Sequence, residues 1–265
     1  MPSNHQPTTG NRQPIFSIIT IVYNGENVLK GTICSVINQT FQNYEYIIID
    51  GASKDKTLDI IEKYADKITK IISEPDKGLY DAMNKGLNLA TGDFVLFLNA
   101  GDRFYSNNVL EHIAAKITDD TDIIYGETML VNDNREELGT RSEKTTHRLP
   151  ENLTWKSFSY GMSVCHQSIF VHRTMTSHYI EKNLAADIDW IITAMKKSRI
   201  TVNAHLIVSA YLVGGVSKQK LKQSLKDRFF VLQKHYGVLP NIFNHVMIAL
   251  KALKYFVIGA FHNLS

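Results

Sequence analysis

The chain has 265 residues and a formal net charge of +3; 44% of its residues are hydrophobic and 21% are charged. These values are typical of a globular protein with one large domain, and they exclude collagen-like, coiled-coil and wholly disordered chains. Two cysteines, Cys34 and Cys165, are too few for a zinc cluster or a disulfide framework, so we expect a reducing compartment. Residues 1–14 are polar, which predicts a disordered leader and no signal peptide.

The first hundred residues alternate between apolar runs and amphipathic segments. The β-branched run at 15–22 predicts a strand that is buried on both faces, and the apolar spacing at 28–37 predicts a helix. The same reasoning predicts further strands at 44–50, 68–72 and 94–98, and further helices at 58–64 and 79–90. Strands that alternate with helices indicate a Rossmann-like α/β fold, with a mainly parallel sheet and right-handed crossovers.

The second half of the chain has a weaker pattern. We expect a strand at 122–126, a helix at 184–195 and a strand at 201–212, which Gly214 and Gly215 would end. The segment 131–148 is polar and rich in charge. It is therefore predicted to be an exposed, mobile loop.

Polar residues follow each of the four predicted parallel strands. They are Tyr23 and Asn24, then Asp50, then 74–76, and finally 99–102. Ligands of open parallel sheets bind beyond the carboxyl ends of the strands, so these residues are candidates for a binding site. For any one of them a simple turn is the alternative explanation, because Asp and Asn favour turns.

Three familiar site motifs are absent from the sequence. Neither a Gly-x-Gly-x-x-Gly fingerprint nor a P-loop occurs, which argues against a dinucleotide dehydrogenase and against a P-loop NTPase. A Gly-x-Ser-x-Gly elbow is also missing. Without a glycine cradle, a nucleoside diphosphate would need another counter-charge. A divalent metal held by a carboxylate such as Asp102 would supply it.

Four motifs, in this order, closely resemble those of family 2 glycosyltransferases: SIITIVYN at 17–24, IDGASKD at 49–55, EPDKGLYDAMNKG at 74–86 and TGDFVLFLNAGD at 91–102. The resemblance covers about residues 15–217 and implies a GT-A fold, in a family that builds many bacterial surface polysaccharides. It divides the chain into a nucleotide-sugar-binding half at 15–102, an acceptor half at 103–217 and a tail at 218–265.

The resemblance also implies which residues bind the donor. Asp50 would hydrogen-bond the nucleotide base and Tyr23 would stack near it, while Asp76 would lie near the base and ribose. The remaining donor-binding residues would be Asn24, Lys77 (near the phosphates) and Asn99. Asp102 would be the last acid of a metal-binding Asp-x-Asp-like motif for Mg²⁺ or Mn²⁺. Where many members have Asp-Ser-Asp-Asp, this chain has Asn-Ala-Gly-Asp at 99–102, so one charged ligand remains.

The segment ADIDW at 186–190 resembles the acceptor motif of the family. By that match Asp187 is the general base of a single, inverting displacement. Asp189 is the rival, and the two side chains should point in different directions because they lie two residues apart on a helix.

The segment CHQS at 165–168 also resembles a family signature. His166 and Gln167 would contact sugar hydroxyls, although a buried histidine satisfied by the backbone explains His166 equally well. Trp190 would be a sugar-stacking residue or a core residue.

The tail is basic and apolar. Over 216–265, eight Lys and Arg residues stand against one acid, Asp227. The segment 242–261 places Asn244, Lys251 and Lys254 on one stripe of a helix, with apolar residues elsewhere. Two central lysines would each cost about 2.5–3.5 kcal/mol in a spanning helix. An interfacial helix on an anionic membrane surface fits better, and packing on the domain core or in a homodimer is the alternative.

The predicted function is an inverting, hexosyl-type glycosyltransferase. It would move a sugar from a nucleotide-sugar donor to a glycan acceptor, which the tail suggests is lipid-linked. It would be cytoplasmic and peripheral at the inner face of the cell membrane. A catalytically weak nucleotide-sugar-binding module is one alternative, favoured by the lost acids at Asn99 and Gly101. A nucleotidyltransferase ranks lower because YNGEN at 23–27 lacks a basic residue. Nucleic acid is not expected as a partner, since the tail has no reading motif.

Overall fold

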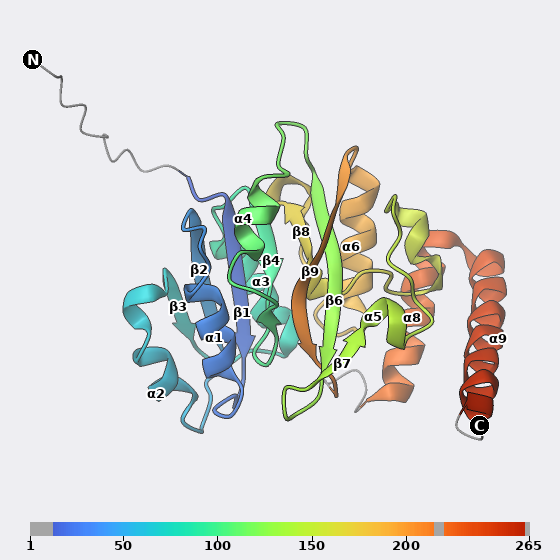
Figure 1. Ribbon diagram of the computed structural model, residues 1–265, viewed down its shortest axis with the longest axis horizontal. Helices are drawn as coiled ribbons and strands as arrows, with labels where there is room; N and C mark the ends of the chain where they lie inside the picture. Colours follow the sequence, from blue (N-terminus) through green and yellow to red (C-terminus); the bar gives the residue numbers. More distant parts are fainter. Residues whose placement is uncertain (1–12, 215–219, 263–265) are drawn as a thin grey trace, which may run out of the picture.

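The computed structural model describes residues 13–214 and 220–262, with side chains described as far as residue 250. A mixed sheet of nine described strands lies at the centre of the molecule (Figure 1). β1 (Phe16–Val22) lies between β2 (Tyr44–Asp50) and β4 (Phe94–Phe97), and β3 (Lys70–Ser73) adds to β2. All three of these pairings are parallel, which confirms the arrangement expected for the first hundred residues.

Beyond β4 the sheet becomes mixed. β8 (Ile169–His172) runs antiparallel to β4 and to β6 (Ile123–Val131), whereas β9 (Thr201–Leu212) runs parallel to β6. Two shorter strands, β5 (Arg103–Phe104) and β7 (Glu137–Thr140), pair antiparallel with β9 and β6. The parallel arrangement therefore belongs mainly to the first half of the chain.

Helices cover both faces of the sheet. α1 (Leu29–Ile37) and α4 (Val109–Ala114) share one apolar cluster, and α3 (Leu79–Leu89) and α6 (Ala186–Lys197) share the other. Alternate residues of β1 enter the two clusters, which is why this strand is apolar at nearly every position. The remaining short helices are α2 (Thr57–Glu62), η1 (Ala65–Lys67), η2 (Trp155–Tyr160), η3 (His166–Ser168) and η4 (Arg173–Met175).

The prediction of a loop over 131–148 is wrong for half of that segment. β7 forms a hairpin with β6, and α5 (Arg141–Lys144) follows directly. Thr140 and Glu143 form a reciprocal capping box at the start of α5. This Thr-x-x-Glu signature is readable in the sequence, but the high charge of the segment masked it.

Two helices form the tail, α8 (Leu221–Tyr236) and α9 (Val238–His262). α9 includes Pro240, which is tolerated there because the first turn of a helix has no use for that N–H. Asn241 and Asn244 are buried, and Asn241 Nδ2 donates to Phe229 O of α8 (3.0 Å). Asn244 is the one residue of the predicted polar stripe whose side chain is described, and it is buried, whereas Leu239 and Phe243 of α9 are exposed. The side chains of Lys251 and Lys254 lie outside the described residues.

Parts of three expectations lie outside the described residues: the leader at 1–12, Gly215, and the start of the tail at 218–219. Among the helices that are described, none has the length and hydropathy needed to span a bilayer.

Candidate active site

A cavity of about 490 Å³ opens where β1 and β4 end. Residues after β1 and β4 form one side of it, and α6 with the η3 segment contributes to the other. The cavity brings together these predicted residues: Tyr23, Asn24, Asn99, Asp102, His166, Gln167 and Asp187. The sequence places them on four separate segments, and the topology of the sheet makes them neighbours.

Asp50 lies at the end of β2, outside the cavity lining, and is fully buried. Its Oδ2 accepts hydrogen bonds from Ser53 N (3.1 Å) and Ser73 Oγ (2.7 Å). These bonds hold the turn that follows β2. The structure therefore shows Asp50 ordering the adjacent loop, and contact with a nucleotide base stays a prediction.

Tyr23, Gly51 and Asp76 converge beside the cavity. A Cβ added to Gly51 would collide with Asp76 Oδ2 and would lie 3.3 Å from Tyr23 Cδ2. The Tyr23 ring is 63% exposed, so one of its surfaces is available for stacking. Lys77 is exposed on the loop before α3 and does not line the cavity.

Asp102 is 6% exposed and well bonded. Gln167 Nε2 donates to its Oδ2 (2.9 Å), and Leu212 N donates to its Oδ1 (3.1 Å). Burial raises the pKa of Asp102 to about 7, although both hydrogen bonds and the nearby Arg135 act in the opposite direction. Arg135 lies in the β6–β7 turn, and its side chain extends to the residue before Asp102, where Nη1 donates to Gly101 O (2.5 Å).

The oxygen atoms needed for a hard metal ion are few. Over the described residues no group of three or more His, Cys, Asp or Glu side chains could hold a metal. Asn99 Oδ1, however, is buried without a hydrogen-bond partner and lies in the same cavity as Asp102. A carboxylate and an amide oxygen are suitable ligands for Mg²⁺ or Mn²⁺. They fit such an ion if further oxygens come from a bound substrate or water.

Asp187 lies in the first turn of α6 and lines the cavity. Ile188 N donates to its Oδ1 (2.9 Å). Burial raises the pKa of Asp187 from 3.8 to about 6, against the hydrogen bonds from the backbone and from the Tyr80 side chain. A carboxylate with such a pKa is ionised at neutral pH and is a better proton acceptor than an ordinary aspartate.

Asp189 points away from the cavity. Its Oδ1 accepts hydrogen bonds from His235 Nε2 (2.7 Å) and Lys234 Nζ (2.8 Å), both on α8. Burial alone would raise the pKa of Asp189, but these two partners outweigh burial and lower it. Residues two apart on a helix are about 200° apart around its axis. Asp187 therefore faces the cavity while Asp189 ties α6 to α8.

His166 and Trp190 belong to an aromatic cluster behind the cavity. Trp190 is 2% exposed and stacks on Tyr179 with ring centroids 5.1 Å apart. It does not line the cavity, so of the two alternatives for Trp190 the structure shows a core position. His166 lies closer to the cavity, where it hydrogen-bonds the Tyr179 hydroxyl (2.6 Å), and burial lowers its pKa to about 4.

Sequence reasoning missed three polar residues that line the cavity: Tyr80, Asp133 and Tyr211. Tyr80 lies in the third motif, but the apolar period of α3 explained it as a helix residue. Asp133 lies in the segment predicted to be a loop, and Tyr211 lies near the end of β9. Only their proximity in the folded chain connects them, so no local pattern could have identified Asp133 or Tyr211.

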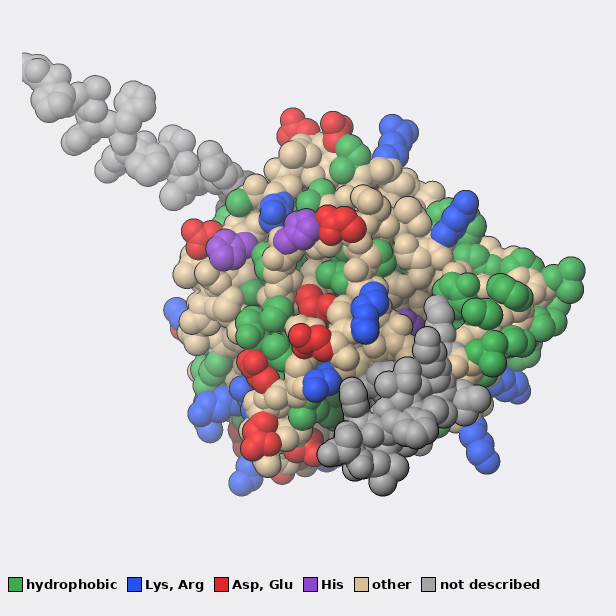
Figure 2. All heavy atoms as spheres, turned by 45° about the vertical axis from the view of Figure 1, so that its right-hand side comes forward, with side chains coloured by type: hydrophobic (Ala, Val, Ile, Leu, Met, Phe, Trp, Pro, Cys, Tyr) green, Lys and Arg blue, Asp and Glu red, His purple; other side chains and the backbone are tan. Residues whose placement is uncertain are grey.

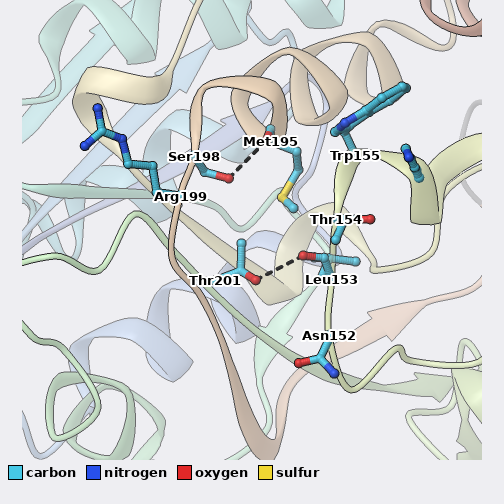
Figure 3. Close-up of a pocket in the computed structure, with 9 residues that line it drawn as sticks. Asn152, Leu153, Thr154, Trp155, Met195, Ser198, Arg199 and Thr201 are labelled. Carbon is cyan, nitrogen blue, oxygen red and sulfur yellow. Dashed lines mark hydrogen bonds between the residues drawn. The ribbon is translucent and has the colours of Figure 1, made fainter.

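A second hollow, of about 370 Å³, lies at the opposite end of α6 from Asp187 (Figure 3). It is lined by residues 152–156, which lie just before η2 and at its start, and by residues from the end of α6 to β9. Among the described residues that line it, Trp155 alone is aromatic, and that ring stacks on Tyr236 (5.4 Å) and lies 4.9 Å from Lys196 Nζ. With these contacts in place, the ring offers little stacking surface for a sugar.

Comparison with known proteins gives consistent matches. The model of the family described as glycosyl transferase family 2 matches residues 17–179. The "PGL/p-HBAD biosynthesis glycosyltransferase" of Mycobacterium tuberculosis is 31% identical over 215 residues, which cover 77% of this chain and 79% of that protein. The "UDP-Glc:alpha-D-GlcNAc-diphosphoundecaprenol beta-1,3-glucosyltransferase WfgD" of Escherichia coli is 24% identical over 246 residues, 89% of this chain and 94% of the other.

Solved structures share the fold at low sequence identity. S. aureus TarS 1–349 in complex with UDP-GlcNAc has a TM-score of 0.65 at 21% identity, with 90% of this chain and 66% of that chain covered. The mannosyltransferase PcManGT from Pyrobaculum calidifontis, in complex with GDP-Man and Mn²⁺, has a TM-score of 0.63 at 14% identity, with 96% and 82% covered. These similarities confirm the expected GT-A fold.

Proposed function

The chain belongs to glycosyl transferase family 2, and from that premise we propose that it transfers a hexosyl group from a nucleotide-sugar donor to a lipid-linked glycan, with inversion, in surface polysaccharide synthesis. One observation carries the proposal. The donor-side residues Asn99 and Asp102 and the base candidate Asp187 line the same cavity from different segments of the chain. An acceptor hydroxyl beside Asp187 would thus face a donor held over β1 and β4.

Asp187 is the base in this proposal. It would take the proton of the acceptor hydroxyl while that oxygen forms a bond to the anomeric carbon of the donor. The bond from this carbon to the diphosphate oxygen would break, and its electron pair would leave with the nucleoside diphosphate. Attack from the face opposite the leaving group inverts the configuration. Asp187 is partly exposed and also hydrogen-bonded by Tyr80, so it can be oriented without being shielded from the acceptor.

The donor side would bind the nucleotide and its charge. Asp102 and Asn99 would hold Mg²⁺ or Mn²⁺, which supplies charge neutralisation for a leaving diphosphate. The exposed ring of Tyr23 would stack on the base, and Asp76 beside it would accept hydrogen bonds from the base or ribose. Lys77, exposed on the next position of the same loop, remains the predicted contact for the phosphates.

The lipid-linked acceptor is supported by the surface of the tail. Apolar side chains gather where α8 and α9 meet, at the projecting right-hand end of the molecule in Figure 2. The exposed fractions there are large: 80% for Leu239, 61% for Phe243 and 53% for Phe230. Contiguous exposed apolar surface marks an interaction site. Exposed Lys222 and Lys226 on α8 would favour an anionic membrane as the partner.

A donor and acceptor screen tests the proposal. The purified protein, with Mn²⁺ or Mg²⁺, would meet UDP-, GDP- and dTDP-sugars with and without a polyprenyl-diphosphate-linked sugar. We expect release of a nucleoside diphosphate that depends on the acceptor and is lost in Asp187→Asn. Full activity in Asp187→Asn would overturn the assignment of the base. Donor binding without turnover on any acceptor would instead support the weak binding module. Pyrophosphate release from a nucleoside triphosphate would point to a nucleotidyltransferase.

A further inference from the structure

A third hollow, of about 340 Å³, lies between the acceptor half and the tail. It is lined by basic and hydroxyl-bearing side chains, among them His147, Arg148, Ser157, Tyr160 and Arg228. No Asp or Glu belongs to its lining over the described residues. Such a composition favours an anionic ligand, because the pocket offers hydrogen-bond donors and positive charge but no carboxylate to repel the ligand.

Arg228 of α8 is the unusual member of this pocket. Its Nε is buried without a hydrogen-bond partner, and within residues 13–214 and 220–250 no carboxylate lies within ion-pair distance of it. Burial lowers the pKa of this guanidinium. Arg228 as a whole is half-buried, and a charge that is partly removed from water is stabilised by pairing with an anion. An anion in the pocket would supply both the missing counter-charge and the missing acceptor.

Two side chains of the pocket lie beside one backbone position. A Cβ built on Gly161 would lie 3.6 Å from His147 Cε1 and 3.9 Å from Arg228 Nη1. Gly161 ends η2 with φ of 110°, a conformation that favours glycine. The turn after η2 therefore brings the imidazole and the guanidinium, which come from distant parts of the chain, to the same place.

The pocket adjoins the active site on one side and the tail on the other. Met162 lines the cavity of Asp187, and the next residue, Ser163, lines the Arg228 pocket. Arg141 fixes this shared wall by donating to the carbonyl oxygens of both. Ile248 of α9 lines the pocket from the tail, so the pocket lies between the proposed base and the helix with the exposed apolar face.

We propose that the Arg228 pocket binds the diphosphate group of the acceptor, with the acceptor sugar beside Asp187 and the lipid chain along α9. The inference rests on the proposed function, because it assumes an acceptor in which a diphosphate joins sugar and lipid. The order of the three sites along the molecule matches the order of the three parts of such an acceptor. A guanidinium binds phosphate oxygens through two parallel hydrogen bonds, which suits a diphosphate.

The test compares two acceptors that carry the same sugar, one on farnesyl diphosphate and one on an uncharged octyl group. In Arg228→Gln the ratio of kcat/KM for the diphosphate acceptor to kcat/KM for the octyl acceptor should fall by about tenfold or more, as expected for one charge-assisted pair. The matched control Arg199→Gln alters an exposed arginine outside the pocket and should leave this ratio unchanged. An unchanged ratio in a folded Arg228→Gln would overturn the proposal.

Two further measurements distinguish a membrane headgroup from the acceptor diphosphate and test the anion pocket independently of sugar transfer. If Arg228→Gln weakens binding to phosphatidylglycerol vesicles but leaves the acceptor ratio intact, the pocket binds a membrane headgroup and the assignment to the acceptor is wrong. Calorimetry with sodium pyrophosphate in EDTA needs no turnover. Binding to the wild type and loss in Arg228→Gln would support the anion pocket even if no sugar transfer is found. Absence of pyrophosphate binding to the wild type would count against the pocket itself.

Discussion

Replacing Asp187 with Asn should abolish transfer and at the same time stabilise the protein at alkaline pH. Burial raises the pKa of Asp187 from 3.8 to about 6. Between these two values the folded chain holds a proton that the unfolded chain has lost, so the free energy of unfolding falls as pH rises. Well above pH 6, Asp187 is ionised in the folded state at a site where burial disfavours the charge. The neutral amide of Asn removes this cost in free energy.

The magnitude follows from the difference between the two pKa values. A difference of about 2 corresponds to about 3 kcal/mol. Asp187 is partly exposed, so we expect a smaller gain of about 1–2 kcal/mol at pH 8. For a chain of this size the melting temperature should rise by about 2–4 °C. At pH 4 the folded acid is mostly neutral and the unfolded acid is only partly ionised, so the gain should be small, and below about pH 3 it should vanish.

Chemical denaturation of the wild type and Asp187→Asn at pH 4 and pH 8 measures the effect, and nucleoside diphosphate release measures activity. In the wild type, activity should rise with pH through about 6 as the base becomes ionised. Asp189→Asn is the matched control, because it should keep activity and lose about 1–2 kcal/mol of stability with its partners on α8. Equal destabilisation of Asp187→Asn at both pH values would refute the raised pKa and indicate a structural carboxylate.

Three other substitutions probe the remaining parts of the site. Gly51→Ala should weaken donor binding by about tenfold, because the new methyl group displaces Asp76. Calorimetry with the donor measures the affinity, and an unchanged affinity would mean that the nucleotide base binds elsewhere. Phe243→Glu should remove up to about 3 kcal/mol of the free energy of binding to anionic vesicles. It should not lower the melting temperature, because the residue is 61% exposed. If the variant instead loses a dimer in sedimentation and keeps its vesicle binding, the membrane assignment is wrong. Asp102→Ala should abolish metal-stimulated turnover, and full stimulation in this variant would exclude Asp102 as a ligand.

The fold and the side of the cavity that follows β1 and β4 could be predicted from sequence because their signals are local. Apolar runs identify β1, β2 and β4, and polar residues directly after such strands are brought to one edge by parallel pairing. The antiparallel entry of β8 between β4 and β6 has no such signal, since it depends on long-range pairing. A local pattern therefore predicted a mainly parallel sheet, whereas the complete sheet is mixed.

The two acids of α6 show where sequence reasoning ends. Their spacing predicts that they point in different directions, but it cannot tell which direction leads to the cavity. The partners that separate them, His235 and Lys234, lie more than forty positions away in the tail. Trp190 illustrates the same limit, because its burial depends on Tyr179 and Phe97, which come from other segments.

The hydrogen bonds between the α6 region and α8 affect where such proteins can be truncated and whether their parts can be exchanged between relatives. A tail that served only to attach the enzyme to a surface could be deleted or exchanged between relatives without harm. Here Asp189, which is 7% exposed, accepts hydrogen bonds from Lys234 and His235 on α8. Asp227 of α8 accepts a hydrogen bond from Leu184 N just before α6 (2.8 Å). Truncation before α8 would leave a buried carboxylate unpaired in the helix that carries Asp187. The tail and the catalytic domain should therefore be inherited, expressed and engineered as one unit.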